Sequence, residues 1–210
     1  MYLSRVELNV GLRETMKALQ SPSKFHGAVE SSFPGERERR LWRIDNLGGK
    51  YYILILSETV PDLTHFSEQF GYPGIYETKD YSPLLNRITE GSVWKFRLTA
   101  NPTIATRRVS GSKKQNVPHI TVEFQKKWLL DRAERLGFSV DEKIFDVTGR
   151  KWYSFYKNNG GDFVRLLSVS FEGILTVTDK EKFRAALCGG IGREKAYGQG
   201  LLTVIKVGCG

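Results

Sequence analysis

The chain has 210 residues, 40% of them hydrophobic, and a formal net charge of +9. This length allows a real hydrophobic core, as one large domain or two small ones. No apolar run is long enough to span a membrane and no charged-then-apolar leader opens the chain, so we expect a cytoplasmic protein without a membrane partner. Two cysteines and three scattered histidines suggest neither a disulfide framework nor a metal site, and we expect no cofactor.

The positive charge is concentrated in the second part of the chain. Residues 1–100 carry 13 Lys and Arg against 12 Asp and Glu, whereas residues 101–210 carry 19 against 11. Such a basic segment favours a polyanionic partner. Nucleic acid is the better candidate than a membrane surface, because no basic amphipathic helix with a strong apolar face accompanies the charge.

The first part of the chain predicts the element order β-α-β-β-α-β. Alternating side chains over residues 1–10 indicate a half-buried strand. Helices are expected near 12–20 and 24–33, the second with Ser21 as N-cap and Pro22 in its first turn. Residues 41–45 and 50–58 form a hairpin across Asn46 to Gly49. A short helix over 63–70 and a strand near Ile75 complete the series.

The same order returns after residues 89–92. Strands are expected over 92–100, 138–147 and 163–177, with a possible extra hairpin at 151–157 and a last strand over 201–207. A helix within 120–137 is closed by Gly137, and Asp179 caps a helix through Leu187. We therefore expect an α+β fold of two tandem ferredoxin-like domains, residues 1–90 and 91–210.

The segment CGGIGREKAYGQGLL (residues 188–202) packs five glycines around two cations. Glycine allows positive φ and close approach to a ligand, so the loop is typical of a phosphate cradle. Its spacing fits neither a dinucleotide fingerprint nor a P-loop nor a kinase glycine loop. A flexible turn before an edge strand remains an equal alternative.

Two other charged segments have open interpretations. The loop 101–118 contains four basic residues and no acid, which is typical of a solvated charge run or of a nucleic-acid contact: Arg107, Arg108, Lys113 and Lys114. In PGERERRLW, the alternation of Glu with Arg37, Arg39 and Arg40 favours a salt-bridged surface.

Several motifs together resemble the CasE family, the repeat-RNA endoribonucleases of type I-E CRISPR systems. They are SFEGILTVTD with GGIGREKAYGQGLL near the carboxy terminus, FRLTANP, and MYLSRVELN, SPSKFH and LWRID near the amino terminus. The resemblance implies a metal-independent enzyme that cuts precursor CRISPR RNA at the 3′ base of the repeat hairpin, leaving a 2′,3′-cyclic phosphate. It also implies that the protein stays on the hairpin beside the backbone and other subunits of the Cascade complex.

His26 is the leading catalytic candidate. By itself it is better explained as a helix residue that shares a face with Val29 and Phe33, but the family places its catalytic histidine here. Histidine is also the natural acid or base near neutral pH. Some family members carry a tyrosine where this chain has Ser23, so Lys24 is the supporting catalytic candidate, with Tyr153 and Lys157 as alternatives.

RNA contacts are expected from three segments. The resemblance assigns the stem's major groove to the hairpin residues, whose alternative is a solvated edge hairpin. The glycine loop is expected to contact the RNA backbone and to pack between the domains. Besides the four basic residues of the loop 101–118, the candidates are Arg150, Lys151, Lys157, Arg165, Gly190, Gly192, Arg193, Lys195 and Gly198. A non-catalytic hairpin-binding subunit and a small-molecule-binding regulatory domain remain alternatives.

Overall fold

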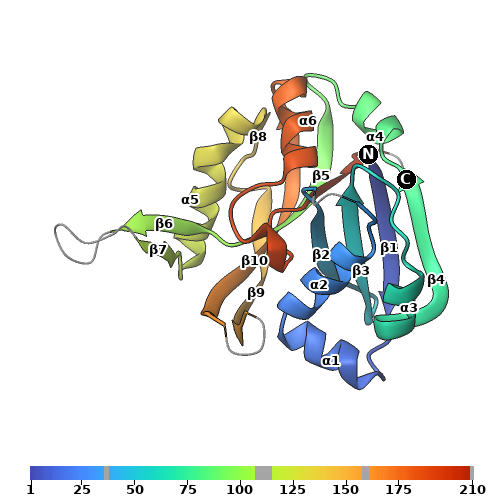
Figure 1. Ribbon diagram of the computed structural model, residues 1–210. Helices are drawn as coiled ribbons and strands as arrows, with labels where there is room; N and C mark the ends of the chain where they lie inside the picture. The colour runs from blue at the N-terminus through green and yellow to red at the C-terminus, as the bar shows by residue number, and fades with distance from the viewer. Residues whose placement is uncertain (36–37, 107–114, 158–160, 209–210) are drawn as a thin grey trace.

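The computed structural model describes residues 1–35, 38–106, 115–157 and 161–208 and shows an α+β fold with two larger antiparallel sheets and one two-stranded sheet (Figure 1). We call residues 1–90 the N-terminal half and residues 91–210 the C-terminal half. No helix in the described ranges has the length and apolar character needed to cross a membrane.

The N-terminal half builds its sheet in the order β2-β3-β1-β4, with antiparallel neighbours throughout. Its elements are β1 (Tyr2–Leu8), α1 (Arg13–Gln20), α2 (Ser23–Ser31), β2 (Leu41–Leu47), β3 (Lys50–Ser57), α3 (Thr64–Phe70) and β4 (Gly71–Asp80). The predicted hairpin turn is confirmed. Helix α2 starts at Ser23, so Pro22 rather than Ser21 occupies the N-cap, without a side-chain capping bond.

Alternation along the strands gives this sheet two different faces. Val6 and Ile53 are opposite each other and point into a core under the helices, where the rings of Phe25, Phe66 and Phe70 meet. Helix α2 therefore lies against the sheet because its buried residues contribute to this core. The other face of the sheet is available to the C-terminal half.

The C-terminal half repeats the arrangement with longer strands. Its sheet runs β11-β5-β10-β8, and β9 also pairs with β10. Its elements, with the connecting helix, are α4 (Ser82–Asn86), β5 (Val93–Ala100), β6 (Thr103–Thr106), β7 (Gln115–Pro118), α5 (Val122–Ala133), η1 (Glu134–Leu136), β8 (Phe138–Ser139), β9 (Phe145–Tyr156), β10 (Phe163–Val177), α6 (Lys180–Gly189), η2 (Lys195–Tyr197) and β11 (Leu202–Lys206).

The predicted helix ends at Gly137 and Asp179 are confirmed, whereas one predicted strand is wrong. The Asp179 side chain accepts from the backbone of Glu181 and Lys182, and Gly137 adopts φ 80°. The expected strand over 138–147 is wrong, because the chain leaves the sheet after Ser139 and returns at Phe145. The residues expected to form a separate hairpin at 151–157 are instead the continuation of β9 along β10. Helix α4 and the β6–β7 pair were not predicted.

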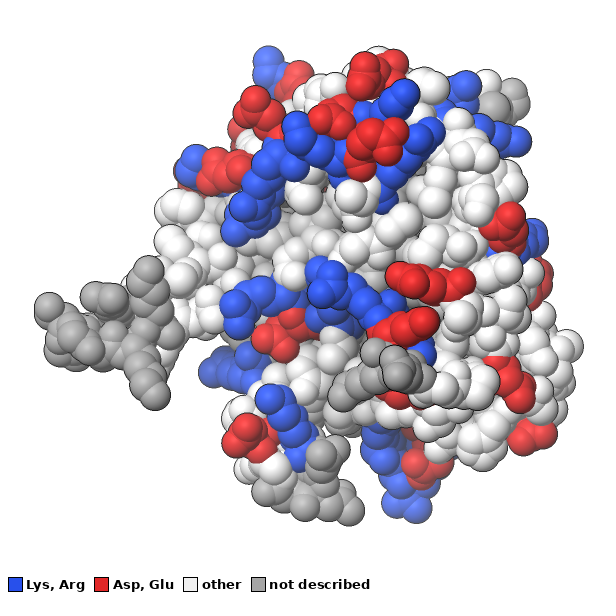
Figure 2. Space-filling model, turned by 45° about the horizontal axis from the view of Figure 1, so that its top comes forward, with Lys and Arg blue, Asp and Glu red and all other residues white. Residues whose placement is uncertain are grey.

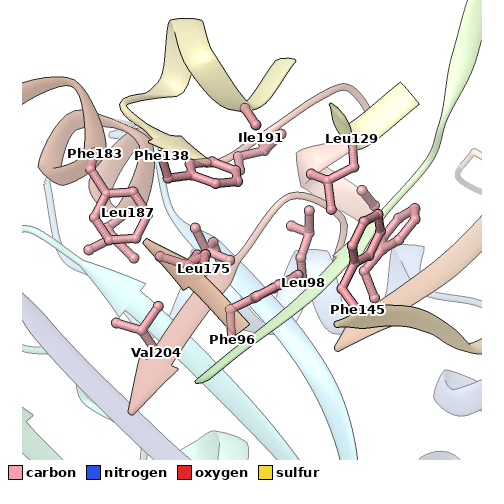
Figure 3. Close-up of a cluster of buried hydrophobic side chains, with 14 of the residues drawn as sticks. Phe96, Leu98, Leu129, Phe138, Phe145, Leu175, Phe183, Leu187, Ile191 and Val204 are labelled. Atoms are coloured by element: carbon pink, nitrogen blue, oxygen red, sulfur yellow. The ribbon is translucent and has the colours of Figure 1, made fainter. Parts of the chain in front are cut away.

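The core of the C-terminal half lies between its sheet and helices α5 and α6 (Figure 3). Phe96 and Leu98 of β5 point toward Leu175 of β10, while Leu129 and Phe183 approach from the helices. Ile88, which precedes the boundary turn, is also buried in this core. The segment after α4 therefore packs with the C-terminal half.

A buried ionic cluster and a small apolar cluster join the two halves. The apolar cluster comprises Leu41, Leu56, Tyr81 and Leu201. Beside it, Arg43 is 1% exposed and forms a bidentate pair with Asp45 at 2.7 and 2.8 Å. The same guanidinium donates to the carbonyl oxygens of Arg97 and Leu201, at 2.9 and 3.0 Å, and to Thr203 Oγ1 at 2.8 Å. All five of its donors are thus used, and three of the bonds cross between the halves.

Candidate functional site

The glycine loop between α6 and β11 wraps the edge strand β2 of the N-terminal half. A side chain at Gly190 would meet Leu41 at 2.8 Å, and one at Gly198 would meet the Trp42 ring at 2.6 Å. Because consecutive strand residues point to opposite faces, the loop covers both faces of β2. Gly190 and Gly198 have φ values of 71° and 73°, where glycine is favoured. The two glycines serve the packing of one half on the other.

Other members of the loop have different surroundings. Gly192 lies against the Trp128 ring of α5, within the C-terminal half. Lys195 donates through Nζ to the carbonyl oxygen of Gly189 at 2.7 Å, and burial lowers the pKa of its ammonium. Arg193 is exposed. The ammonium of Lys195 therefore closes the loop on itself, while Arg193 is accessible to a ligand.

His26 lies on α2 at the boundary and faces the glycine loop. Its ring is edge-on to that of Tyr197, with the ring centroids 6.4 Å apart. On its own helix, Nδ1 is 3.9 Å from Oε1 of Glu30, whose other oxygen accepts from Arg40 at 3.0 Å. Arg40 thus forms a salt bridge as expected, but it is buried and stacks on the Phe33 ring, so its expected surface location is wrong.

The second predicted catalytic residue is not brought to His26. Lys24 and His26 are two residues apart, which separates their side chains by about 200° around the helix. Lys24 is exposed and its Nζ lies 3.9 Å from Glu14 of α1. Ser23 opens the helix and its hydroxyl contacts that of Ser21 at 3.1 Å. The face of α2 that carries His26 thus approaches Tyr197. Tyr197 belongs to the glycine motif, but the sequence predicted no role for it.

A cleft of about 330 Å³ opens between the halves next to this contact. Pro22 and Phe25 of the N-terminal half line it, opposite Lys151, Tyr153 and Tyr197 of the C-terminal half. The Lys151 ammonium donates to the carbonyl oxygen of Leu19 at 2.9 Å, and desolvation lowers its pKa. Burial raises the pKa of Tyr153 to about 12, so its phenol stays protonated at neutral pH.

The paired strands β9 and β10 (Figure 1) carry further basic side chains. Arg150 lines the cleft and its Nη1 reaches the carbonyl oxygen of Ile120 at 3.3 Å. Arg165 stacks over the Trp152 ring at 4.6 Å, and Lys157 is exposed at the end of β9. Arg107, Arg108, Lys113 and Lys114 lie outside the described residues. Figure 2 shows that Lys and Arg gather in bands on the visible face, with acidic side chains among them.

This arrangement provides the groups that an acid–base reaction on a phosphodiester needs. An imidazole lies beside Tyr197, which lines the cleft between the halves, and cationic side chains that can bind phosphate lie in the cleft and on the adjoining hairpin. Among the described residues, no three His, Cys, Asp or Glu side chains are grouped as ligands for a metal ion.

The chain resembles proteins of one family along almost its whole length. The family model described as CRISPR associated protein matches residues 1–206. The CRISPR-associated endoribonuclease Cse3 of Thermus thermophilus is 29% identical over 222 residues, covering 97% of this chain and 99% of that protein. A structure of CRISPR endoribonuclease Cse3 bound to a 19-nucleotide RNA superposes with a TM-score of 0.81 at 28% identity, covering 98% and 100%.

A second RNA complex gives the same result. The structure of Thermus thermophilus Cse3 bound to an RNA representing a pre-cleavage complex has a TM-score of 0.78 at 25% identity, covering 97% of this chain and 98% of that one. The agreement covers nearly the whole chain and therefore extends over both halves. The chain therefore belongs to the CRISPR associated protein family, as a member of its CasE group.

Proposed function

We propose that this protein is a site-specific endoribonuclease that binds the hairpin of a CRISPR repeat and cuts precursor CRISPR RNA at the 3′ base of the stem. The observation that carries the proposal is the position of His26, which contacts Tyr197 of the C-terminal half beside a cleft that Arg150 and Lys151 line. The full-length likeness to Cse3 supports the same substrate class.

The proposed reaction is a transesterification that needs no metal ion. The 2′-oxygen attacks the adjacent phosphorus, the bond from phosphorus to the 5′-oxygen breaks, and a 2′,3′-cyclic phosphate and a 5′-hydroxyl are formed. The 2′-hydroxyl proton must leave and the 5′-oxygen must gain one, and we assign one of these transfers to His26. Lysine and arginine side chains at the cleft stabilise the charged phosphorane.

Lys24 enters this proposal as an RNA contact outside the His26 face. Its ammonium lies on the side of α2 where Glu14 is its neighbour. The hairpin residues Arg150, Lys151, Lys157 and Arg165, together with Arg193, are proposed to bind RNA phosphates, which would make the affinity fall with salt. We assign to Lys195, Gly190, Gly192 and Gly198 the support of the loop that presents Arg193.

We also propose that each half is a ferredoxin-like domain, with a boundary near residue 90. Numbered along the chain within each half, both sheets read 4-1-3-2, with β8 and β9 sharing the place of the second strand. In the cytoplasm the protein would stay on the cleaved 3′ hairpin and join the backbone and other subunits of a Cascade complex.

Reaction products test the proposal directly. Purified protein is incubated with its repeat hairpin in EDTA, and the product ends are identified by mass spectrometry. We expect one cut, a 2′,3′-cyclic phosphate and a 5′-hydroxyl, and no cleavage of a hairpin with a single 2′-deoxy substitution at the cut. Uncut wild-type hairpin would refute catalysis, and a 2′-deoxy substrate that is still cut would refute the proposed nucleophile.

A non-catalytic hairpin-binding subunit is the second candidate. Ser23 favours it slightly, because its short side chain contacts Ser21 instead of reaching the cleft. This candidate predicts tight, salt-dependent binding of the hairpin and no cleavage in any buffer. The same incubation distinguishes the two functions.

A further inference from the structure

A row of three aromatic rings crosses the boundary between the halves. The Phe155 ring of β9 meets Tyr197 at a centroid distance of 5.0 Å and an angle of 73°. Tyr197 in turn meets the His26 imidazole at 6.4 Å and 74°. Both contacts are edge-to-face, the arrangement that aromatic pairs prefer over stacking face to face. His26 therefore belongs to one half of the protein while its aromatic neighbour belongs to the other.

The backbone around Tyr197 is held in a fixed shape. Tyr197 ends η2, which begins after Glu194 and is followed by Gly198. Glu194 has φ 60° and is the non-glycine residue with positive φ among those described. Such a conformation persists where the surrounding structure determines it, and it is found repeatedly at functional sites. The bond from Lys195 to Gly189 and the contact of Gly198 with Trp42 provide that surrounding structure.

The orientation of the imidazole matters because proton transfer requires close, aligned atoms. A general acid or base must come within hydrogen-bond reach of the atom it serves, and a small misplacement slows the reaction strongly. The Tyr197 ring packs edge-on against the imidazole and restricts its rotation by contact.

We propose that Tyr197 is a positioning residue, whose ring holds the His26 imidazole in the orientation that serves the cut. The inference rests on the proposed function, because it gives His26 a proton to transfer. Its essential part is the aromatic ring, so phenylalanine at this position preserves the effect. The C-terminal half thereby completes the catalytic centre of the N-terminal half.

Nuclear magnetic resonance of the histidine rings tests the contact itself. The chain has three histidines, which gives a simple spectrum. Tyr197→Leu removes a ring current and should shift the ring protons of His26, while those of the exposed His65 stay in place. Phe124→Leu is the matched control, because Phe124 stacks on His119 at 5.9 Å. That control should shift His119 and leave His26 unchanged.

Single-turnover cleavage tests the consequence. Tyr197→Leu should slow the cut by about 10- to 100-fold, the effect of a misplaced catalytic group, with the hairpin dissociation constant nearly unchanged. Tyr197→Phe should restore most of the rate, and Phe124→Leu should keep both quantities. A merely structural role predicts weaker binding and lower stability together, and it does not predict rescue of the cleavage rate alone.

The outcomes separate this inference from the proposed function. Wild-type protein that binds the hairpin without cutting it refutes the function, and the resonance of His26 then decides the contact. A wild-type cleavage rate in folded Tyr197→Leu, or an unshifted His26, overturns the positioning role. Should Tyr197→Leu fail to fold, Tyr197→Met replaces it with a longer flexible side chain that fills more of the space without an aromatic ring.

Discussion

The two halves contribute different kinds of group to their shared boundary. The N-terminal half supplies ionisable side chains, His26 and Glu30 on α2 and Arg43 on β2. To these groups the C-terminal half presents mainly backbone carbonyls and the Tyr197 ring of its glycine loop, while its Lys151 ammonium bonds back to the carbonyl oxygen of Leu19. The more conspicuous glycine motif therefore holds the halves together, and the reactive group lies on a short helix of ordinary composition.

The ionic part of the boundary should show the largest effect on stability. Arg43→Met removes all five hydrogen bonds of a buried guanidinium and, among the described residues, leaves the side chain of buried Asp45 with the longer contact to Arg97 alone, at 3.5 Å. We expect a loss of about 3–5 kcal/mol in the free energy of unfolding, measured in urea. Arg5→Met is the control, since the pair of Arg5 and Glu77 is exposed and such pairs contribute at most about 1 kcal/mol. Equal losses would contradict the joining role of Arg43.

The glycine loop at the boundary should show the second largest effect on stability. Gly198→Ala places a methyl group 2.6 Å from the Trp42 ring at φ 73°, so both backbone strain and overpacking oppose folding. We expect a loss of about 2–4 kcal/mol. Gly91→Ala has nearly the same φ, 75°, with open space around the new methyl, and should lose only the backbone part, about 1–2 kcal/mol. If the two variants are equally stable, close packing of the loop on β2 is wrong.

The dependence of stability on alkaline pH tests the burial of Tyr153, which lines the cleft from the C-terminal half. The phenol of Tyr153 has its pKa raised by burial to about 12, and a tyrosine in an unfolded chain titrates near 10. The folded state thus keeps its proton longer, so this contribution is fully present below about pH 10 and is lost as pH rises to about 12. Over that window the wild type should lose about 2–3 kcal/mol in the free energy of unfolding relative to Tyr153→Phe, which has no phenol to titrate. A difference that stays constant from pH 8 to 12 would show that Tyr153 titrates normally.

Sequence patterns between neighbouring residues predicted most of the fold, but they did not predict contacts between segments that are distant in the sequence. Alternation and caps were sufficient for β1, the β2–β3 hairpin and α6, since each depends on neighbours along the chain. The gap between β8 and β9 was missed because Phe138, Ser139 and Val140 alternate as in a strand. The alternation of Arg40 with glutamates predicted a salt-bridged surface, but Arg40 is buried between Phe33 and Glu30.

In the candidate site, too, a sequence motif predicted a single residue but not its contact with a distant segment. His26 was found from the resemblance to a family, whereas its contact with Tyr197 joins residues that lie 171 positions apart, which no local pattern indicates. Lys24 was predicted as the supporting group because Ser23 stands where some members of the family carry a tyrosine. Helical geometry separates Lys24 from His26.

The most direct test compares these two residues of α2. Single-turnover cleavage of the repeat hairpin in EDTA is measured for wild type, His26→Ala and Lys24→Ala, and hairpin affinity is measured for each. We predict that His26→Ala loses at least about 100-fold in the cleavage rate while it still binds the hairpin. Lys24→Ala should cut at nearly the wild-type rate. Undiminished cleavage by His26→Ala, or loss of cleavage in Lys24→Ala with His26 intact, would contradict a catalytic centre at the boundary of the two halves.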